Sequence, residues 1–406
     1  MDVEIRPARD SEMAGFKQVA KRSLLIPPEI APPEAIDTIR PEWTLCAFEN
    51  GALATSYAWW PLKMRFNGTS CPVAGITYVS TNPVCRRRGY LRRIIAKHFE
   101  MMHEKGQQAI AALHPSRAAI YHRYGYAVVS TQQSYSLEPR QLVFTRPENV
   151  RNDLGNLREA GANEEDVFKD LYRRFCQDRT GYIHRGKATW AAGVLAPPLG
   201  NEALFKIVYE ENGEPLGYVL YTARTRRRSG GELQHQLIIR DFIWLTPRAC
   251  HALWRYFSGM DLANEIKWMH VPPDDPLPHL INEPRQLHIS SRDGLMARIV
   301  DLAPALTGRR YDAEGKICFE LIDELCPWNR GRWTLEAGAG EAELRQAKQE
   351  PEIILPVDTL AMLLFGQISP SRAGAMGRLE IALPGTLPVW DRLFPTRHRP
   401  FCPDFF

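Results

Sequence analysis

The chain has 406 residues, of which 44% are hydrophobic and 24% are charged, and its formal net charge is +4. This length exceeds the size at which a single hydrophobic core stops growing, so we expect two or three domains. So small a net charge gives no reason to expect a nucleic acid or an anionic membrane as a partner.

We expect neither a membrane-spanning segment nor a signal peptide in this sequence. No apolar stretch approaches about 18 residues, and residues 1–4 lack the charged and then apolar pattern of a signal peptide. The eight cysteines are scattered, with neither CxxC spacing nor a histidine at the spacing of a metal ligand. We therefore expect no metal site, and scattered thiols of this kind indicate a reducing cytoplasm.

Residues 1–145 alternate between strand and helix signals, which is typical of an α/β domain. A short strand at 3–6 precedes an amphipathic helix. Two β-rich runs, 43–48 and 52–60, are separated by Asn50-Gly51, the strongest short signal for a β-hairpin. The following expected elements are a strand at 74–79, a helix from Tyr90 to Lys105, a strand at 109–113, a short helix at 116–124 and a strand at 126–129.

The helix from Tyr90 to Lys105 has the clearest periodicity of these elements. Its apolar positions recur at spacings of three and four residues, as an amphipathic helix requires. They are Leu91, Ile94, Ile95, His98, Phe99 and Met102. Gly106, directly after the last lysine, is a typical C-terminal stop.

A polar stretch between about 146 and 160 indicates a domain boundary, after which the α/β pattern repeats. The repeat includes a strand at 237–245 and a helix that begins at Thr246 or Pro247. Its strand-to-helix turn is bulky and lacks glycine, which argues against a diphosphate site there. A third region follows a proline-rich stretch, and its segment 295–306 is a helix or a strand.

The most informative segment is the turn at 81–92, Thr-Asn-Pro-Val-Cys-Arg-Arg-Arg-Gly-Tyr-Leu-Arg, which joins the strand at 74–79 to the long helix. A strand, a basic turn with glycine and a helix N-terminus together make an anion site, because backbone N–H groups and the helix dipole converge there. Three arginines add mobile positive charge. A solvated basic loop is the alternative, but the order of the elements favours a diphosphate ligand.

The same turn resembles motif A of the GNAT N-acetyltransferases, Arg/Gln-x-x-Gly-x-Gly/Ala. Arg86 and Gly89 match this motif, whereas Leu91 replaces its second small residue. With Leu91 at this position, the turn resembles that of the Eis (enhanced intracellular survival) branch of the superfamily. The segment at 118–126, Ala-Ala-Ile-Tyr-His-Arg-Tyr-Gly-Tyr, also resembles the Ile-Tyr-Gly-Arg-Phe-Gly-Tyr segment of that branch.

Further motifs, at 245–256, 298–311 and 326–329, resemble the second and third domains of the Eis family. The resemblance thus covers nearly the whole chain. It implies an α/β fold with two tandem GNAT-like domains, each a mixed sheet flanked by helices, and a C-terminal domain like sterol carrier protein 2. The expected domains are a catalytic GNAT domain at 1–148, a degenerate GNAT-like domain at 149–285 and a sterol-carrier-like domain at 286–406.

The resemblance also implies which residues bind acetyl-CoA. Val79, Ser80 and Thr81 would end the strand that hydrogen-bonds the pantetheine arm and the acetyl group. Ser116 and Arg117 would touch the cofactor near the thioester, although the family generally carries an acidic residue at the position of Arg117. The residues that would cradle the diphosphate are Arg86, Arg87, Arg88, Gly89, Tyr90, Leu91 and Arg92.

Two catalytic residues follow from the same resemblance. Tyr121 matches the general acid that protonates the coenzyme A thiolate; the alternative is a core tyrosine packed with Tyr124 and Tyr126. The general base in this family is the α-carboxylate of the last residue, here Phe406. The apolar, proline-stiffened tail fits a buried end better than a frayed one, while Asp404 is the competing base and a merely anchored tail is the remaining alternative.

The sequence therefore predicts a cytoplasmic, acetyl-CoA-dependent N-acetyltransferase that needs no metal and modifies a primary amine, either aminoglycoside-like or lysine-like. Two alternatives remain open. One is an N-acyltransferase for another acyl-CoA, and the other is a non-catalytic protein whose third domain binds a lipid or another ligand. A homohexamer is implied by the resemblance alone.

Overall fold

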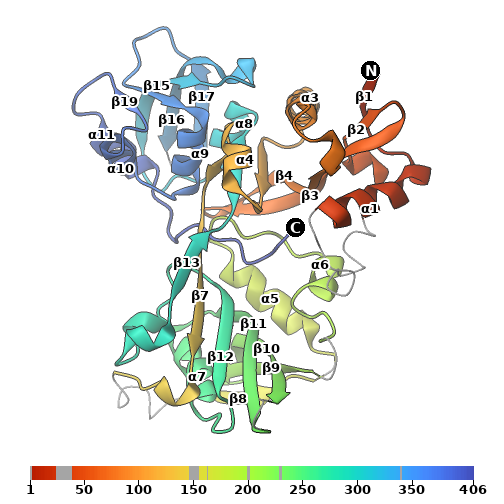
Figure 1. Cartoon of the computed structure of the whole chain (residues 1–406). Coiled ribbons are helices and arrows are strands. Elements are labelled where there is room, and N and C mark those ends of the chain that lie inside the picture. The colour runs from red at the N-terminus through yellow and green to blue at the C-terminus, as the bar shows by residue number, and fades with distance from the viewer. Residues whose placement is uncertain are drawn as a thin grey trace. The chain divides into compact units, whose positions relative to one another are not determined.

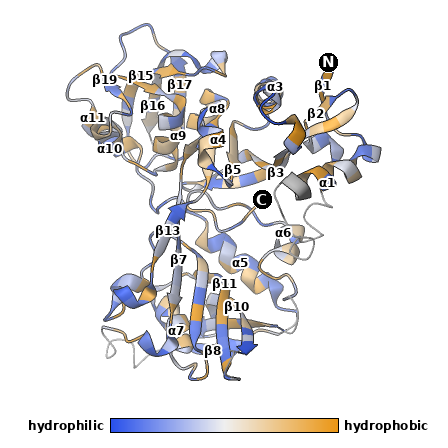
Figure 2. Ribbon diagram, in the orientation of Figure 1, coloured by the Kyte–Doolittle hydropathy of each residue, from blue (hydrophilic) through white to orange (hydrophobic). Residues whose placement is uncertain are grey.

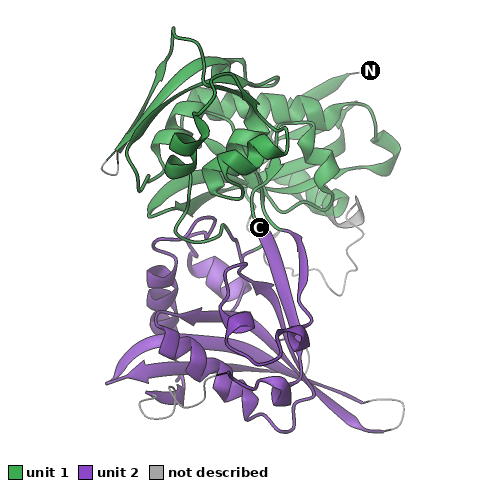
Figure 3. Ribbon diagram, turned by 90° about the vertical axis from the view of Figure 1, so that its left-hand side faces the viewer, with its two compact units in different colours: residues 1–130, 294–400, 405–406 green, residues 131–293, 401–404 purple. Residues whose placement is uncertain are grey.

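The structure, a computed structural model, describes residues 2–23, 39–145, 155–161, 163–198, 202–227, 231–338 and 341–406. The chain forms two compact units, shown in green and purple in Figure 3. Unit 1 contains residues 1–130, 294–400 and 405–406, and unit 2 contains residues 131–293 and 401–404. Each unit is described by itself below.

Unit 1 begins with a seven-stranded mixed sheet whose order is β1-β2-β3-β4-β5-β14-β6 (Figure 1). Strands β4 and β5 are parallel, and the other neighbours are antiparallel. The Asn50-Gly51 hairpin between β2 and β3 is confirmed, with positive φ at both residues. The strands are β1 (Val3–Arg6), β2 (Cys46–Glu49), β3 (Ala52–Phe66), β4 (Thr69–Thr81), β5 (Ile110–Leu113), β6 (Ala127–Val128) and β14 (Met296–Ile299).

Helices cover both faces of this sheet because each carries one apolar stripe. Helix α1 (Met13–Ser23) packs through Phe16 on one face. Helix α3 (Tyr90–Lys105) covers the other face and ends at Gly106 in the left-handed conformation, as the sequence predicted. Its buried residues differ from the predicted stripe only in that Tyr90 is buried and Leu91 is partly exposed; they are Tyr90, Ile94, Ile95, His98, Phe99 and Met102.

Unit 1 also holds a five-stranded sheet of order β17-β16-β15-β18-β19, with β15 and β18 parallel. Helix α9 is buried along most of its length and is strongly apolar (Figure 2). The elements of this part are α8 (Leu302–Thr307), β15 (Gly315–Ile322), β16 (Gly331–Gly338), β17 (Glu341–Gln346), β18 (Ile353–Pro356), α9 (Val357–Phe365), α10 (Pro370–Ala375), β19 (Glu380–Ile381) and α11 (Leu387–Leu393).

Unit 2 repeats the arrangement of the first sheet, with strand order β13-β7-β12-β11-β10-β9-β8 and a parallel β11–β12 pair. Helices α7 and α5 pack through separate apolar clusters. The elements are β7 (Thr131–Leu137), β8 (Asn156–Glu159), α5 (Glu165–Phe175), α6 (Lys187–Ala192), β9 (Ala203–Glu211), β10 (Glu214–Arg227), β11 (Leu233–Trp244), α7 (Pro247–Ser258), β12 (Glu265–Val271) and β13 (Ser290–Asp293).

The strand pairing links parts of the chain that lie far apart in sequence. Segment 295–306, left open as helix or strand, contains β14 and all of α8 except its last residue, Thr307. Strand β14 inserts between β5 and β6 of the first sheet, and β7 joins the sheet of unit 2. The expected domain boundaries at 148 and 285 stay a prediction. They do not anticipate that β14 pairs within the first sheet or that β7 pairs within the sheet of unit 2. No helix in the described ranges has both the length and the apolar composition to cross a membrane.

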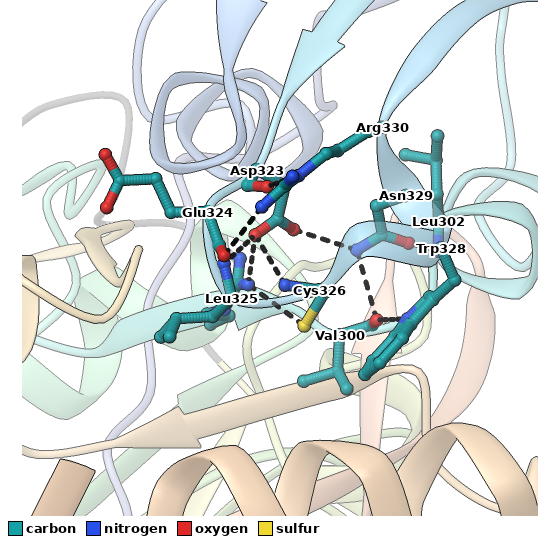
Figure 4. Close-up of polar contacts among 10 residues, drawn as sticks. Val300, Leu302, Asp323, Glu324, Leu325, Cys326, Trp328, Asn329 and Arg330 are labelled. Atoms are coloured by element: carbon teal, nitrogen blue, oxygen red, sulfur yellow. Dashed lines mark hydrogen bonds and ion pairs between the residues drawn. The ribbon is translucent and has the colours of Figure 1, made fainter.

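A buried polar network joins β14 to the loop after β15 (Figure 4). The Asp323 carboxylate accepts a hydrogen bond from Arg298 Nη2 at 2.6 Å and another from Asn329 Nδ2 at 3.0 Å. It also accepts the backbone N–H groups of Leu325 and Cys326. Both charged side chains are at most 1% exposed. Because every Asp323 bond is made away from water, loss of its charge would leave Arg298 buried and uncompensated.

Replacing Asp323 with asparagine should therefore lower the free energy of unfolding of unit 1 by about 3 kcal/mol. The control is Asp312→Asn, because Asp312 pairs with Arg397 while both side chains are more than a third exposed. That substitution should cost less than about 1 kcal/mol. Urea unfolding followed by circular dichroism measures both values. If both variants lost the same free energy of unfolding, the buried pair would contribute no more to stability than the exposed pair, which would contradict this prediction.

Candidate active site

The first sheet of unit 1 opens where β4 and β5 part. The two strands pair in parallel from Val73 with Ile110 to Gly75 with Ala112, and this pairing ends although β4 continues to Thr81. Beyond Gly75, β4 continues without β5 as its neighbour. A strand that splays from its parallel neighbour can hydrogen-bond an extended chain, such as a pantetheine arm, in the manner of an added strand.

A β-bulge re-aims the end of β4. Thr77 pairs with Ala58 and Ser80 with Ser56, so two residues, Tyr78 and Val79, oppose one residue of β3. Tyr78 has a φ of 49°, which is costly for a side chain of this size and persists only where the surroundings enforce it. Within the bulge, Val79 packs on the cluster beneath α3 and Tyr78 on the cluster beneath α1.

Ser80 follows the bulge and has a notable hydroxyl group. It is 5% exposed, and its Oγ has no hydrogen-bond partner among the described residues. Buried polar atoms are normally paired, so an unsatisfied hydroxyl at this position indicates a place for a polar ligand. The three residues expected to bind the pantetheine arm, Val79, Ser80 and Thr81, thus lie at the end of β4, where the bulge changes the direction of the strand.

The basic turn has the geometry of an anion site. Arg87 and Gly89 both have positive φ, 64° and 78°, while Arg86 between the strand and Arg87 is extended. Gly89 is the N-cap of α3, without a side-chain cap and without an acidic residue in the first turn. The first N–H groups of a helix lack partners within the helix, so they and the helix dipole can bind phosphate oxygens.

Two residues of this turn have contacts with Glu49 of β2. Arg88 donates from Nη1 to the Glu49 carboxylate and from Nη2 to the Val84 carbonyl oxygen at 3.1 Å. Tyr90 is 5% exposed and donates its hydroxyl to Glu49 at 2.7 Å. These bonds fix the turn and orient both side chains toward Glu49. Arg86, Arg87 and Arg92 are exposed, and Leu91 is partly exposed.

Tyr121 lies on the short helix α4 (Ala118–His122), which follows β5. It is 6% exposed and meets Tyr126 edge-on, with ring centroids 5.9 Å apart. Burial raises the pKa of Tyr121 to about 12, so its hydroxyl keeps its proton and can donate it. Ser116 and Arg117, directly before the helix, are exposed.

The last residue of the chain lies at the point where the two strands part. A Cβ atom on Gly75 would be 2.5 Å from Cδ1 of Leu62 and 2.9 Å from Cδ2 of Phe406, so any larger residue at this position would push one of these side chains aside. The ring of His114, the residue after β5, is 5.2 Å from the Phe406 ring and 4.3 Å from the Phe405 ring. The C-terminal residue thus lies beside Gly75 of β4 and beside the residue that follows β5.

Comparison with known proteins shows what kind of protein has this site. Residues 4–129 and 181–299 match models of the acetyltransferase (GNAT) domain, and residues 302–403 match the sterol carrier protein domain. The N-acetyltransferase Eis of Mycobacterium tuberculosis is 31% identical over 317 residues, which cover 76% of this chain and 74% of that relative. The chain belongs to the Eis family of GNAT N-acetyltransferases.

A second sequence relative agrees with this assignment, and a solved structure is similar in fold. An uncharacterized N-acetyltransferase of Streptomyces avermitilis is 30% identical over 342 residues, covering 84% of this chain and 83% of that relative. The crystal structure of Eis1 from Mycobacterium abscessus has a TM-score of 0.84 at 24% identity and covers 99% of this chain and 100% of that one. The expected fold, two GNAT-like domains and a sterol-carrier-like domain, is confirmed, and the Eis-family protein is an acetyltransferase.

The corresponding turn in unit 2 of this Eis-family enzyme is built differently. Helix α7 is capped by Thr246, whose Oγ1 accepts the Ala249 N–H at 3.1 Å, and its first residue, Pro247, has no N–H to offer. The start of α7 therefore offers an anion fewer N–H donors than the uncapped start of α3 does.

Several residues of the candidate active site were not predicted from the sequence. His114 carried a weak signal, since it directly follows a buried strand, and Gly75 could have been noticed as a glycine inside a strand. Nothing in the sequence indicates the bulge at Tyr78 or the contacts of Glu49, because both depend on the register between strands. Asp404, the competing base, has its partners in unit 2, where its side chain is 9% exposed and ion-paired with Arg185.

Proposed function

We propose that this Eis-family enzyme transfers the acetyl group of acetyl-CoA to a primary amine by direct attack. The observation that carries the proposal is the position of Phe406 against Gly75, at the point where β4 and β5 part. In this scheme the pantetheine arm lies along Val79, Ser80 and Thr81. In this proposal the carboxylate of Phe406 would lie beside the thioester.

The turn after β4 would hold the diphosphate. Its support is the uncapped N-terminus of α3, the positive φ of Arg87 and Gly89 and the absence of an acidic residue in the first helical turn. For Arg88 and Tyr90, which bond Glu49, we propose contact through their backbone N–H groups. Arg86, Arg87 and Arg92 would supply side-chain charge, Leu91 a further N–H, and Ser116 and Arg117 contacts near the thioester.

The chemistry needs a base, an acid and an oxyanion site. The amine nitrogen attacks the acetyl carbonyl carbon, its proton passes to the Phe406 carboxylate, and β4 N–H groups stabilise the developing oxyanion. The C–S bond then breaks, and Tyr121 gives its proton to the sulfur. A terminal carboxylate has a reference pKa of about 3.3–3.7, so burial must raise that pKa or a water molecule must relay the proton.

The acceptor is the least constrained part of this proposal. We propose an aminoglycoside-like or lysine-like primary amine, acetylated in the cytoplasm by a homohexamer, as the family resemblance implies. Size-exclusion chromatography with light scattering tests the assembly: a mass of six chains is expected, and a monomer would contradict it.

Release of free thiol from acetyl-CoA, measured across aminoglycosides, polyamines and lysine peptides, tests the activity. We expect amine-dependent thiol release and a higher melting temperature with acetyl-CoA, because a ligand that binds only the folded state stabilises it. Arg87→Ala should raise the KM for acetyl-CoA about tenfold. Arg226→Ala is the control, since Arg226 is also exposed but lies in β10. Release only with longer acyl-CoA substrates, or no thermal shift at all, would contradict the proposal.

A further inference from the structure

Glu49, the last residue of β2, is a carboxylate bonded to a turn that carries three arginines. It directly precedes the Asn50-Gly51 hairpin and pairs with Val3 of β1 on one side and with Ala52 of β3 on the other. Its backbone is therefore fixed by the sheet. A negative charge held beside the turn would repel a diphosphate, so its presence there calls for an explanation.

The Glu49 side chain holds two residues of the site at once. One carboxylate oxygen accepts a hydrogen bond from Arg88 Nη1, and the other accepts the Tyr90 hydroxyl at 2.7 Å. The Glu49 side chain is 12% exposed and Tyr90 is 5% exposed, so the contact is largely shielded from water. The bond from Tyr90 and the charge of Arg88 lower the pKa of Glu49, so the carboxylate is ionised at neutral pH.

Arg88 links this carboxylate to the rest of the turn. While its Nη1 bonds Glu49, its Nη2 donates to the Val84 carbonyl oxygen at 3.1 Å. One guanidinium group thus joins the start of the turn to the sheet. The neighbours of Arg88 on either side, Arg87 and Gly89, have positive φ, and backbone of this kind lets successive N–H groups form an anion-binding nest. Positive φ is uncommon for a residue with a side chain, so Arg87 needs support from its surroundings.

Two roles for Glu49 are conceivable, and they affect ligand binding in opposite directions. As a bare charge, Glu49 would repel a diphosphate and compete with it for Arg88. As a support, it would strengthen binding, because a turn already held in its binding shape loses less conformational entropy when the ligand arrives. The contacts favour support, since Glu49 also bonds Tyr90, the first residue of α3, and a competitor for Arg88 would not need this second bond.

We propose that Glu49 is a positioning residue for acetyl-CoA, whose carboxylate holds the turn and the start of α3 in the shape that receives the diphosphate. Every residue of this arrangement belongs to unit 1. The inference rests on the proposed function, in which the same turn holds the diphosphate. Its consequence is that removing a negative charge from the site weakens the binding of a negatively charged ligand.

The first test is Glu49→Gln, which keeps the size of the side chain and removes its charge. We expect the KM for acetyl-CoA to rise about tenfold, the effect of losing one charge-assisted hydrogen bond, while kcat stays within about twofold. S-acetylpantetheine has the same thioester without the diphosphate, so its kcat/KM should not change. The control is Glu12→Gln, because Glu12 pairs with Arg6 at 2.8 Å, outside the turn. It should leave the kinetic constants for both substrates unchanged.

A second readout, binding of coenzyme A measured by isothermal titration calorimetry, does not depend on turnover. Glu49→Gln should bind coenzyme A about tenfold more weakly than the wild type. The same substitution is then made in an Arg88→Met, Tyr90→Phe background, which lacks both donors to Glu49. There it should cause no further loss, because a residue that acts through two others has no effect once they are removed.

The outcomes separate this inference from the proposed function. If Glu49→Gln binds coenzyme A as tightly as the wild type or more tightly, Glu49 is a bare charge and the inference is overturned. Equal losses of kcat/KM with acetyl-CoA and S-acetylpantetheine would also overturn it, because the damage would then extend beyond the diphosphate. If the wild type binds coenzyme A no more tightly than pantetheine, the turn does not hold the diphosphate, and the proposed function of the turn fails together with the role of Glu49.

Discussion

Replacing Tyr121 with phenylalanine should lower kcat by about 10²–10³-fold and leave the KM for acetyl-CoA within about twofold. The leaving thiolate would then depart without a proton donor, and loss of a positioned general acid typically costs a factor of this size. The ring remains, so packing against Tyr126 is kept. Single-turnover measurement of thiol release isolates this step from product dissociation.

Tyr124→Phe is the matched control, because Tyr124 belongs to the same aromatic cluster and is also 6% exposed. It should keep kcat within about threefold. Equal losses in both variants would indicate disturbed packing rather than acid catalysis, and a Tyr121→Phe enzyme with full kcat would exclude Tyr121 as the acid.

The pKa of Tyr121 also predicts part of the pH profile. An acid is active while protonated, and burial raises this pKa to about 12, so Tyr121 should remain protonated throughout pH 6–10. The kcat of the wild type should therefore rise with pH, as the base and the amine lose protons, and should not fall again below pH 10. A descending limb centred near pH 8 or 9 would require another acid.

The sequence predicted those features that are local. The α3 stripe, its stop at Gly106 and the Asn50-Gly51 hairpin depend only on neighbouring residues, and the structure confirms each. The basic turn could also be predicted from the sequence, because strand, turn and helix follow one another directly. Its uncapped helix N-terminus is in place, whereas its role in binding acetyl-CoA stays a prediction.

The features that sequence reasoning missed are long-range. Insertion of β14 between β5 and β6 depends on contacts across more than a hundred residues, which periodicity does not record. The bulge at Tyr78 depends on register with β3, and the bond from Arg88 to Glu49 depends on two strands and a turn meeting. For Phe406, only the family resemblance pointed to the active site, since nothing within a tail specifies where its end will lie.

Removing the terminal carboxylate should cause the largest loss in this enzyme. Extending the chain by one alanine after Phe406 moves the carboxylate by one residue, about 3.5 Å, and should lower kcat by about 10²–10⁴-fold. A C-terminal amide, made by protein ligation, removes only the charge and should cause a similar loss. Both variants lack a base at the site, so the acceptor amine must lose its proton to solvent before it attacks. Their residual rate should therefore rise tenfold per pH unit until most of the amine is in its free, unprotonated form.

Phe406→Leu separates the carboxylate from the ring. It keeps the terminal charge but gives up the contact with His114, whose ring lies 5.2 Å from that of Phe406. We expect this variant to retain at least a tenth of the wild-type kcat, with a similar pH profile, because the ring only holds the carboxylate between Gly75 and His114. If leucine abolished turnover while the alanine extension preserved it, the aromatic ring would be essential and the carboxylate dispensable. That pattern would exclude the terminal carboxylate as the base, and with it direct deprotonation by the end of the chain.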